Sequence, residues 1–250
     1  MKPFLISYCL PCMNRLPSLQ GTLPHTIAAA NISPPVEIVI ADYGSTDGLK
    51  DYLDSLPHLG TFAPGNFLTY IRYDGNPCFH LSHSRNIANL QSHGDYLAQA
   101  GVEMKITDTW FKNVREVIGD GTPKFLVRMR NKHGPYYPTY CPQIAIVERQ
   151  EFIQAGGFDE QFDLYCYEDR DLAARLVRRG LKPTFVKLNF CEYETEITTT
   201  DNKKYQNYKA GLPYKKAAKL MRHILGKNIK NNILVANEGK EWGSTKLYDK

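Results

Sequence analysis

Residues 156–180 read GGFDEQFDLYCYEDRDLAARLVRRG and carry more structural information than any other stretch of the chain. Two glycines free the backbone, an acidic loop follows, and a helix is predicted from Asp169 to Arg179. Glu168 and Asp169 stand where this helix begins. Unpaired amide groups and the helix dipole favour carboxylates at such a position, so the local pattern alone favours helix capping over a catalytic role.

Ahead of this stretch, short apolar runs alternate with amphipathic segments. The predicted strands are 3–10, 36–44, 67–74 and 95–101, and the helices between them are 16–31, 45–56 and 80–93. This order predicts an α/β fold with a doubly wound, mostly parallel central sheet flanked by helices. Ligands of such folds bind beyond the carboxyl ends of the strands, so the candidate loops are 11–15, 42–47, 74–84 and 101–103.

The second half of the chain continues the alternation. Helices are expected at 108–119, 169–179 and 214–225, and strands at 124–130, 144–149 and 183–188. With 250 residues, of which 42% are hydrophobic and 23% charged, the chain suits one α/β domain followed by a tail.

The positive charge is concentrated at the C-terminal end. Residues 201–250 hold twelve Lys and Arg against four Asp and Glu, whereas the whole chain has a net charge of +5. Such a tail suits an anionic membrane surface or an anionic glycan, and a solvated helical face explains it equally well. No basic block alternates with aromatic residues, so we expect no nucleic-acid partner.

The six cysteines are scattered, and Cys9 and Cys12 form a single Cys-x-x-Cys pair. No second pair completes a zinc site, so we interpret them as reduced thiols of a cytoplasmic protein. The chain shows no signal peptide and no apolar run as long as a membrane span. We therefore expect a protein that is soluble or attached to the inner face of the membrane through its basic tail.

Four motifs together resemble the GT-A glycosyltransferases, the family-2-like and galactosyltransferase-like enzymes that use nucleotide-diphosphate sugars. The stretch that begins with GGFDE is similar to their GGFDE…ED-x-DL…RL…G segment. LPCMNRL (10–16), VIADYGSTDGL (39–49) and SHSRNIAN (82–89) resemble their PTYNR, VVDDGSTDGT and ARN motifs. The resemblance implies a GT-A, Rossmann-like domain at 1–195, with a nucleotide-binding part (1–104) and an acceptor-binding part (105–195), followed by a basic helical extension at 196–250.

The resemblance also implies site residues. Asp169 becomes the general base, and Glu168 holds the acceptor hydroxyl. Asp42 becomes the carboxylate that reads the pyrimidine base, although an Asx turn ahead of Gly44 explains it as well. Arg85 either binds the diphosphate or lies on the surface. The nucleotide-sugar-binding residues implied by the family are Pro11, Asn14, Arg15, Asp42, Ser45, Arg85 and Gly101. His80 and His83 are expected to pack beside this loop rather than to bind metal.

The metal motif is incomplete. GDYLAQAGVEM (94–104), laid on the family's GDYLLFLDADM, places Gly101 and Glu103 where the relatives have two aspartates. The histidine that relatives add after the last core strand is also absent, and Glu192 stands near that position. Three interpretations stay open: Mn²⁺ or Mg²⁺ held by Glu103 with Glu192, a leaving group stabilised by Arg85 without metal, or a degenerate protein that only binds.

The reaction implied is transfer of a sugar, with UDP preferred over GDP in the donor, to a glycan or glycolipid hydroxyl, with inversion expected. Tyr136, Tyr137, Tyr165 and Tyr167 are candidates for stacking on the acceptor, with packing as the alternative. Trp242 and Gly243 are a candidate lid over the nucleotide. The main rival is a non-catalytic nucleotide-sugar-binding scaffold. A nucleotidyltransferase is disfavoured because no glycine-rich basic loop follows the first strand.

Overall fold

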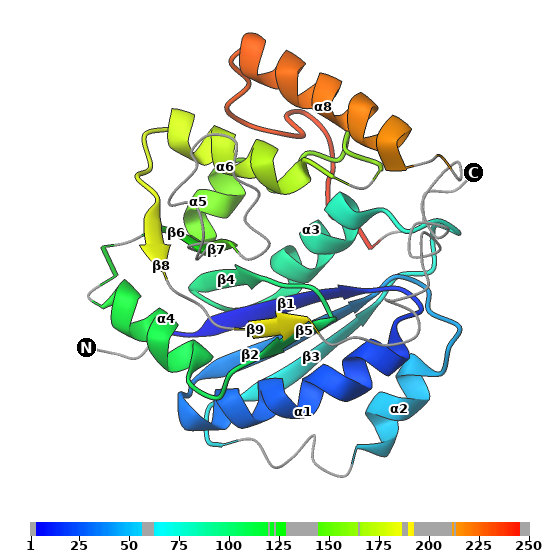
Figure 1. Cartoon of the computed structure of the whole chain (residues 1–250), viewed down its shortest axis with the longest axis vertical. Helices are drawn as coiled ribbons and strands as arrows, with labels where there is room; N and C mark the ends of the chain where they lie inside the picture. The colour runs from blue at the N-terminus through cyan, green and yellow to red at the C-terminus, as the bar shows by residue number, and fades with distance from the viewer. Residues whose placement is uncertain are drawn as a thin grey trace.

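The structure is a computed structural model that describes residues 4–56, 63–119, 121–122, 124–128, 145–164, 166–186, 190–192, 212 and 214–245. A central sheet is covered by helices on both faces (Figure 1). The strands of this sheet are β1 (Ile6–Cys12), β2 (Val36–Asp42), β3 (Phe67–Arg72), β4 (Tyr96–Gln99), β6 (Phe125–Arg128), β7 (Ala145–Glu148) and β8 (Thr184–Val186). Two further strands, β5 (Met104–Ile106) and β9 (Phe190–Glu192), form a separate pair.

The helices divide between the two faces of the sheet. On one face, toward the bottom of Figure 1, lie α1 (Leu16–Ile32), α2 (Leu49–Ser55) and α4 (Trp110–Ile118). On the other face lie α3 (Leu81–Gln91), α5 (Arg149–Gln154), α6 (Glu168–Arg178) and α8 (Tyr214–Lys230). Among the described residues, no helix combines the length and the apolar character that crossing a membrane requires.

The strand order in the large sheet is β3-β2-β1-β4-β7-β6-β8. β1 runs parallel to β2 and β4, and β2 runs parallel to β3. β7 is antiparallel to both of its neighbours, β4 and β6. The prediction of a mostly parallel α/β sheet is therefore confirmed. Because Cys12 lies opposite Asp42, the loops that follow β1 and β2 leave the sheet side by side.

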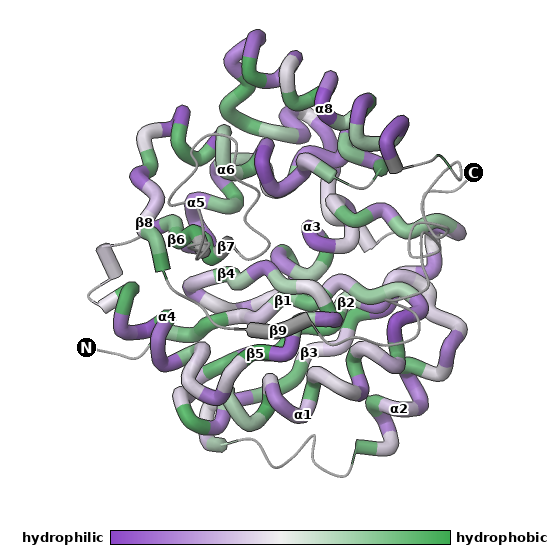
Figure 2. The backbone as a smooth tube through the Cα atoms, in the orientation of Figure 1, coloured by the Kyte–Doolittle hydropathy of each residue, from purple (hydrophilic) through white to green (hydrophobic). Residues whose placement is uncertain are grey.

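Every residue of β1 and β2 is buried, because helices cover both faces of these strands. Under α1 and α4, Tyr8 meets Trp110 and Phe111 edge to face, with ring centroids 5.4 and 5.6 Å away. In the hydropathy colouring, both the strands and the helices that cover them mix hydrophobic and hydrophilic residues (Figure 2). This interior is the platform from which the loops at the carboxyl ends project.

Several predicted boundaries are wrong. The helix expected from residue 45 begins only at Leu49, because Gly48 has a φ of 85° and Asp47 bonds to another loop. The last helix continues past 225 to Lys230. The pairing of β5 with β9 was not predicted, since strands of three residues carry too little periodicity to be recognised.

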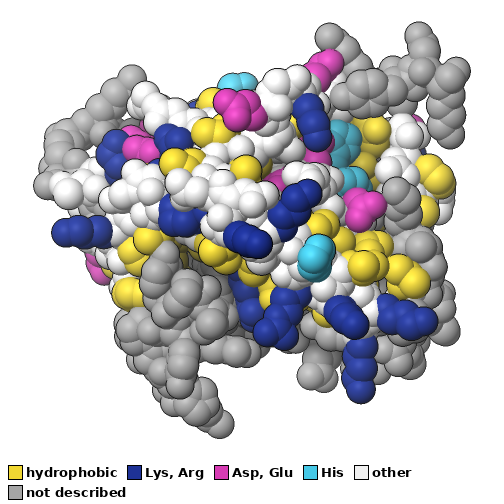
Figure 3. Space-filling view, turned by 90° about the horizontal axis from the view of Figure 1, so that it is seen from above, with side chains coloured by type: hydrophobic (Ala, Val, Ile, Leu, Met, Phe, Trp, Pro, Cys, Tyr) yellow, Lys and Arg dark blue, Asp and Glu magenta, His cyan; other side chains and the backbone are white. Residues whose placement is uncertain are grey.

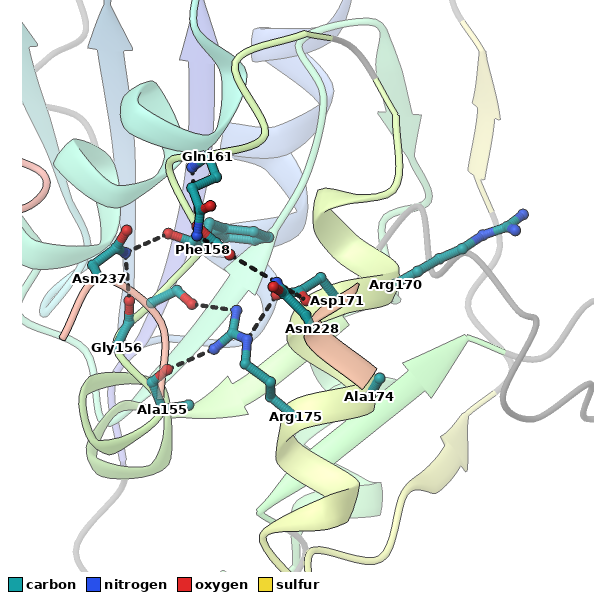
Figure 4. Close-up of polar contacts among 12 residues, drawn as sticks. Ala155, Gly156, Phe158, Gln161, Arg170, Asp171, Ala174, Arg175, Asn228 and Asn237 are labelled. Atoms are coloured by element: carbon teal, nitrogen blue, oxygen red, sulfur yellow. Dashed lines mark hydrogen bonds and ion pairs between the residues drawn. The ribbon is translucent and has the colours of Figure 1, made fainter. Parts of the chain in front are cut away.

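The turn formed by residues 156–160, called the GGFDE turn below, is held by the buried guanidinium of Arg175 on α6 (Figure 4). Arg175 is fully buried. Its Nη1 donates to Ala155 O at 2.5 Å, its Nη2 donates to Gly157 O at 2.8 Å, and its Nε donates to Asp171 Oδ2 at 2.7 Å. One side chain thus satisfies the carbonyl of Ala155 just before the turn, the carbonyl of Gly157 within it, and one carboxylate of its own helix.

The segment from 231 to 245 packs against the other side of the same turn. Asn237 donates from Nδ2 to Gly156 O at 2.8 Å and to Phe158 O at 2.7 Å (Figure 4). The Trp242 ring lies 6.2 Å from the ring of Phe152. The prediction that Trp242 and Gly243 form a lid is wrong, because these residues are packed against α3, α5 and the GGFDE turn.

The tight fit of this segment predicts the effect of Gly156→Ala. A Cβ at Gly156 would lie 2.0 Å from Ala236 O, and the φ of 71° adds backbone strain. We expect the free energy of unfolding in a denaturant titration to fall by about 3 kcal/mol. Gly180→Ala is the matched control, since Gly180 has a φ of 97° but nothing within 4 Å, and should cost about 1 kcal/mol. Equal losses would contradict the packing described here.

Candidate active site

The loops that follow β1 and β2 are fastened to each other by side chains. Asn14 has a φ of 52°, and its backbone N–H donates to Ser45 Oγ at 3.0 Å. The Asn14 side chain accepts from Thr46 N at 2.8 Å, and Asp47 Oδ2 accepts from Leu16 N at 2.8 Å. Asn14 and Ser45, both predicted to bind the nucleotide sugar, therefore hold the two loops together.

Asp42 ends β2 with its carboxylate fully buried. Oδ1 accepts from Ser45 N at 2.8 Å, so the side chain of Asp42 bonds to the backbone three residues on, one residue further than in the predicted Asx turn. Oδ2 accepts from Tyr70 Oη at 2.7 Å and from Arg72 Nη1 at 2.9 Å. Burial, and then the bond to Asp42, raise the pKa of Tyr70 to about 12. A nucleotide base that reaches Asp42 would compete with these donors for its carboxylate oxygens.

Sequence reasoning missed Arg72. It closes β3, and its side chain is 36% exposed while it bridges Asp42 and Asp74. The signal that could have found it is its place at the carboxyl end of a predicted strand, beside the loop after β2. Arg72 brings a cation to the edge of the sheet where an anionic ligand of this fold would bind.

Arg85 lies in α3 and pairs with Glu168 at the start of α6. Arg85 Nη1 and Glu168 Oε1 are 3.0 Å apart, and the two side chains are 11% and 5% exposed. The Arg85 guanidinium carbon also lies 5.1 Å from the centre of the Phe158 ring. Arg85 is therefore not a surface residue, and its charge is already engaged by the carboxylate beside the predicted base.

The second carboxylate oxygen of Glu168 differs from the first in its hydrogen bonding. Glu168 Oε2 is buried and has no hydrogen-bond partner among the residues that the structure describes. Burial, and then the charge of Asp169, raise the pKa of Glu168 to about 7, while Arg85 acts in the opposite direction. Glu168 is thus a carboxyl group that exchanges its proton near neutral pH.

The residues just before the acidic pair have unusual backbone angles. Cys166 has a φ of 100° and Tyr167 a φ of 72°, so two consecutive non-glycine residues occupy the left-handed region. Such conformations cost ~1–3 kcal/mol each and are concentrated at functional sites. Arg170 lies over the Tyr167 ring at 4.8 Å. Asp169, two residues after Tyr167, is 8% exposed, and its Oδ1 accepts from Arg170 N at 2.7 Å.

The end of β4 brings Gly101 and Glu103 together. A Cβ at Gly101 would lie 2.7 Å from each carboxylate oxygen of Glu103, so glycine leaves room for that carboxylate. In the β5–β9 pair, Met104 lies opposite Glu192, which places the backbone of Glu192 beside that of Glu103. Within the described part of the chain, however, no group of three or more His, Cys, Asp or Glu could hold a metal ion. These residues alone do not complete a divalent metal site.

The two histidines have packing roles, as predicted. His80 Nδ1 accepts from His83 N and so caps α3. The ring of His83 bonds to Tyr43 Oη at 2.9 Å and to Ser244 O at 3.1 Å. Burial lowers the pKa of both histidines. Three of the predicted acceptor residues lie outside the described residues, namely Tyr136, Tyr137 and Tyr165.

The solved structures that are similar to this chain include GT-A glycosyltransferases. The chain is similar to a fragment of TarS from S. aureus, with 16% identity and a TM-score of 0.59, over 74% of this chain and 59% of that one. A mannosyltransferase from Pyrobaculum calidifontis matches with 16% identity and a TM-score of 0.60, over 75% of this chain and 57% of that one. The chain thus spans less than two thirds of both, and the predicted GT-A fold is confirmed.

A galactosyltransferase is also among the similar structures. The catalytic domain of β1,4-galactosyltransferase 7 from Drosophila matches with 14% identity and a TM-score of 0.58, over 88% of this chain and 80% of that one. A family model described as the N-terminal domain of galactosyltransferase matches residues 124–200 of the sequence. The predicted galactosyltransferase-like resemblance is confirmed over this part of the chain, which contains the GGFDE turn and α6. No curated protein sequence matches the chain.

The raised pKa of Glu168 predicts how Glu168→Gln changes stability with pH. Burial favours the protonated form of Glu168. Its contribution to the free energy of unfolding is therefore fully present below pH 4.5 and is lost as the pH rises through about 7. Gln cannot ionise, so the variant should gain stability relative to the wild type across this window, by up to about 3 kcal/mol. Denaturant unfolding at pH 5 and pH 8 measures the change.

The control for this comparison is Glu116→Gln, which alters a carboxylate that is 63% exposed on α4. Its stability relative to the wild type should hardly change between the two pH values. If Glu168→Gln and the wild type differ in free energy of unfolding by the same amount at both pH values, the argument from burial is contradicted.

Proposed function

We propose that this protein transfers a sugar from a nucleotide-diphosphate sugar to a hydroxyl group of a glycan or glycolipid acceptor. The observation that carries the proposal is the pair Glu168–Asp169 at the start of α6, buried beside Arg85 and preceded by two strained residues. Such an arrangement fits a general base held in one orientation. The GT-A fold and the partial galactosyltransferase match support the same class of reaction.

In the proposed step, Asp169 takes the proton of the acceptor hydroxyl while that oxygen forms a bond to the anomeric carbon. The bond from this carbon to the donor phosphate breaks, and the electron pair leaves with the nucleoside diphosphate. Glu168 orients the acceptor hydroxyl. A single in-line displacement of this kind inverts the anomeric centre.

Two cations stand near the leaving group in this proposal. Arg85, paired with Glu168, and Arg72, at the end of β3, can meet phosphate oxygens through charge-assisted hydrogen bonds. A diphosphate that attracts Arg85 would weaken its bond to Glu168. Donor binding and the protonation of Glu168 are therefore coupled in our proposal.

For the donor we propose a UDP-sugar. TarS from S. aureus has been solved with UDP and with UDP-GlcNAc, which supports this choice for a chain of the same fold. The loops after β1 and β2, with Pro11, Arg15 and Asp42, would receive the uridine. In base recognition by Asp42, the base would bond to Oδ1 beside Ser45 N or displace Tyr70 or Arg72 from Oδ2.

A divalent metal ion is a further part of the proposal. A Drosophila galactosyltransferase mutant was solved with manganese, UDP-Gal and xylobiose, and the Pyrobaculum mannosyltransferase with GDP-Man and Mn²⁺. In this chain Glu103, with Glu192 on the neighbouring strand, would hold such an ion. When bound, it would neutralise charge on the diphosphate. Because these residues do not complete a site alone, the donor phosphates would supply further oxygen ligands.

A non-catalytic nucleotide-sugar-binding scaffold is the second candidate. It is favoured by Gly101, which replaces a metal-binding carboxylate of the relatives, and by the occupied carboxylate of Asp42. For both the enzyme and the scaffold we propose a location on the cytoplasmic side of a membrane. Binding of a nucleotide sugar without any release of nucleoside diphosphate would identify it.

Asp169→Asn tests the proposed base. Asn cannot accept the proton, so turnover should fall ~10²–10⁴-fold while donor affinity stays within about twofold. UDP- and GDP-sugars are screened by calorimetry for binding and by nucleoside diphosphate release for turnover. Asp108→Asn, an exposed residue before α4, is the control and should keep full turnover. Equal turnover in the wild type and Asp169→Asn would end the case for this base.

Gly101→Asp tests the metal proposal by restoring the missing carboxylate. The new side chain would displace the carboxylate of Glu103 sideways, which a flexible side chain permits, and would add an oxygen ligand. We expect the affinity for Mn²⁺ in the presence of UDP to rise at least about tenfold by calorimetry. Glu103→Gln should abolish the gain. Unchanged Mn²⁺ affinity in Gly101→Asp would argue against a metal at this strand end.

A further inference from the structure

We propose that the outward face of α8 is a docking surface for an anionic lipid bilayer. The proposal rests on the surface of this helix and is independent of the chemistry at Asp169. α8 forms the outermost element on its side of the molecule in Figure 1, and no acidic residue occurs from Tyr214 to Lys230.

The cations of α8 lie on one side of the helix. With about 100° per residue, Ala217, Met221 and Asn228 point to one side, and these three are buried against the domain. The opposite side, over an arc of about 140°, holds six Lys and Arg, together with His223 and Gly226. The six exposed Lys and Arg, called the basic stripe below, are Lys215, Lys216, Lys219, Arg222, Lys227 and Lys230.

Two exposed aliphatic side chains border the basic stripe. Leu220 is 50% exposed and Ile229 is 47% exposed, and they project at the two opposite margins of the stripe. Among the described residues only Ile32, Phe67 and Ile153 are other large hydrophobic side chains with comparable exposure. A cationic surface edged by aliphatic groups matches a bilayer, which offers anionic headgroups and apolar chains together.

The composition of the basic stripe argues against a nucleic acid as the occupant. Readers of nucleic acid combine cations with aromatic, Asn or Gln side chains that stack on bases or bond to their edges. The stripe instead has five Lys and one Arg, aliphatic side chains at both margins, and His223 as the single aromatic ring within its arc. Lys acts here as a point charge, which suits a diffuse layer of phosphate headgroups. Figure 3 looks onto this side, where Lys and Arg side chains are spread over the surface.

α8 is attached firmly enough for docking to orient the whole domain. Asn228 Nδ2 donates to Asp171 Oδ1 at 2.9 Å and to Asp159 Oδ2 at 2.8 Å. Arg178 Nη1 donates to Asn228 O at 3.3 Å. Because Asp171 belongs to the first turn of α6, the docked helix is one hydrogen bond away from the helix that begins with Glu168. A bilayer under α8 would therefore fix the orientation of the acidic pair relative to the membrane.

The electrostatic attraction between the basic stripe and an anionic bilayer is sufficient for reversible binding. Each Lys or Arg close to an anionic bilayer contributes ~1 kcal/mol, and salt screens this attraction within a Debye length. Six Lys and Arg on one stripe therefore support adsorption that weakens as the salt concentration rises. The two aliphatic residues add a smaller part that salt does not remove.

The test is cosedimentation of the full chain with vesicles, without any substrate. The vesicles contain phosphatidylcholine with 30 mol% phosphatidylglycerol, or phosphatidylcholine alone. We expect binding to the anionic vesicles only, and about tenfold weaker binding of Lys219→Glu/Lys230→Glu. Lys50→Glu/Lys112→Glu changes the charge equally on α2 and α4, on the opposite face of the sheet, and should bind within about twofold of the wild type.

Two further measurements separate the occupants. At low salt, Leu220→Ser/Ile229→Ser should bind the anionic vesicles as the wild type does. At 0.3 M salt, its affinity for the vesicles should fall by a factor about three times larger than that of the wild type. Circular dichroism confirms that each variant is folded. Wild-type protein that ignores anionic vesicles, or binding that is unchanged in Lys219→Glu/Lys230→Glu, overturns the proposal. Binding to a single-stranded oligonucleotide but not to vesicles assigns the stripe to a nucleic acid and overturns it as well.

Discussion

The buried guanidinium of Arg175 is the contact on which the candidate site depends. It joins α6 to the GGFDE turn through Ala155 O and Gly157 O, and Asp171 neutralises it within α6. Removing one partner of such a buried pair costs ~3–5 kcal/mol, because the other charge stays in the interior without compensation. The segment 231–245 packs against the other side of the GGFDE turn. α6, and with it the acidic pair, is therefore positioned by polar contacts in the interior rather than by surface loops.

The acidic pair itself is a balance between one cation and two carboxyl groups. Arg85 favours the charged form of Glu168, whereas burial and the neighbouring Asp169 favour the neutral form and prevail. Because of this balance, an anionic ligand that binds Arg85 would change the protonation of Glu168. The strain at Cys166 and Tyr167 is consistent with a site that holds its carboxyl groups where packing alone would not place them.

Much of the fold could be predicted from the sequence because its signals are local. The alternation of apolar runs with amphipathic segments, and the acidic residues in the first turn of α6, need only neighbouring residues to be recognised. The GGFDE motif likewise placed Glu168 and Asp169 at a helix start. The partners of Asp42 and Arg85 could not be predicted, because these pairs depend on strand register and on the packing of α3 against α6. Arg72 was missed for the same reason, and Trp242 was misassigned because its packing partner is 90 residues away in sequence.

The side-chain links between the loops after β1 and β2 have a consequence for protein engineering. Asn14 reaches Ser45 and Thr46, and Asp47 reaches back to Leu16, so neither loop keeps its shape without the other. A change of donor preference by transplanting one loop from another enzyme would break both sets of links. The two segments have to be exchanged together as a single cassette.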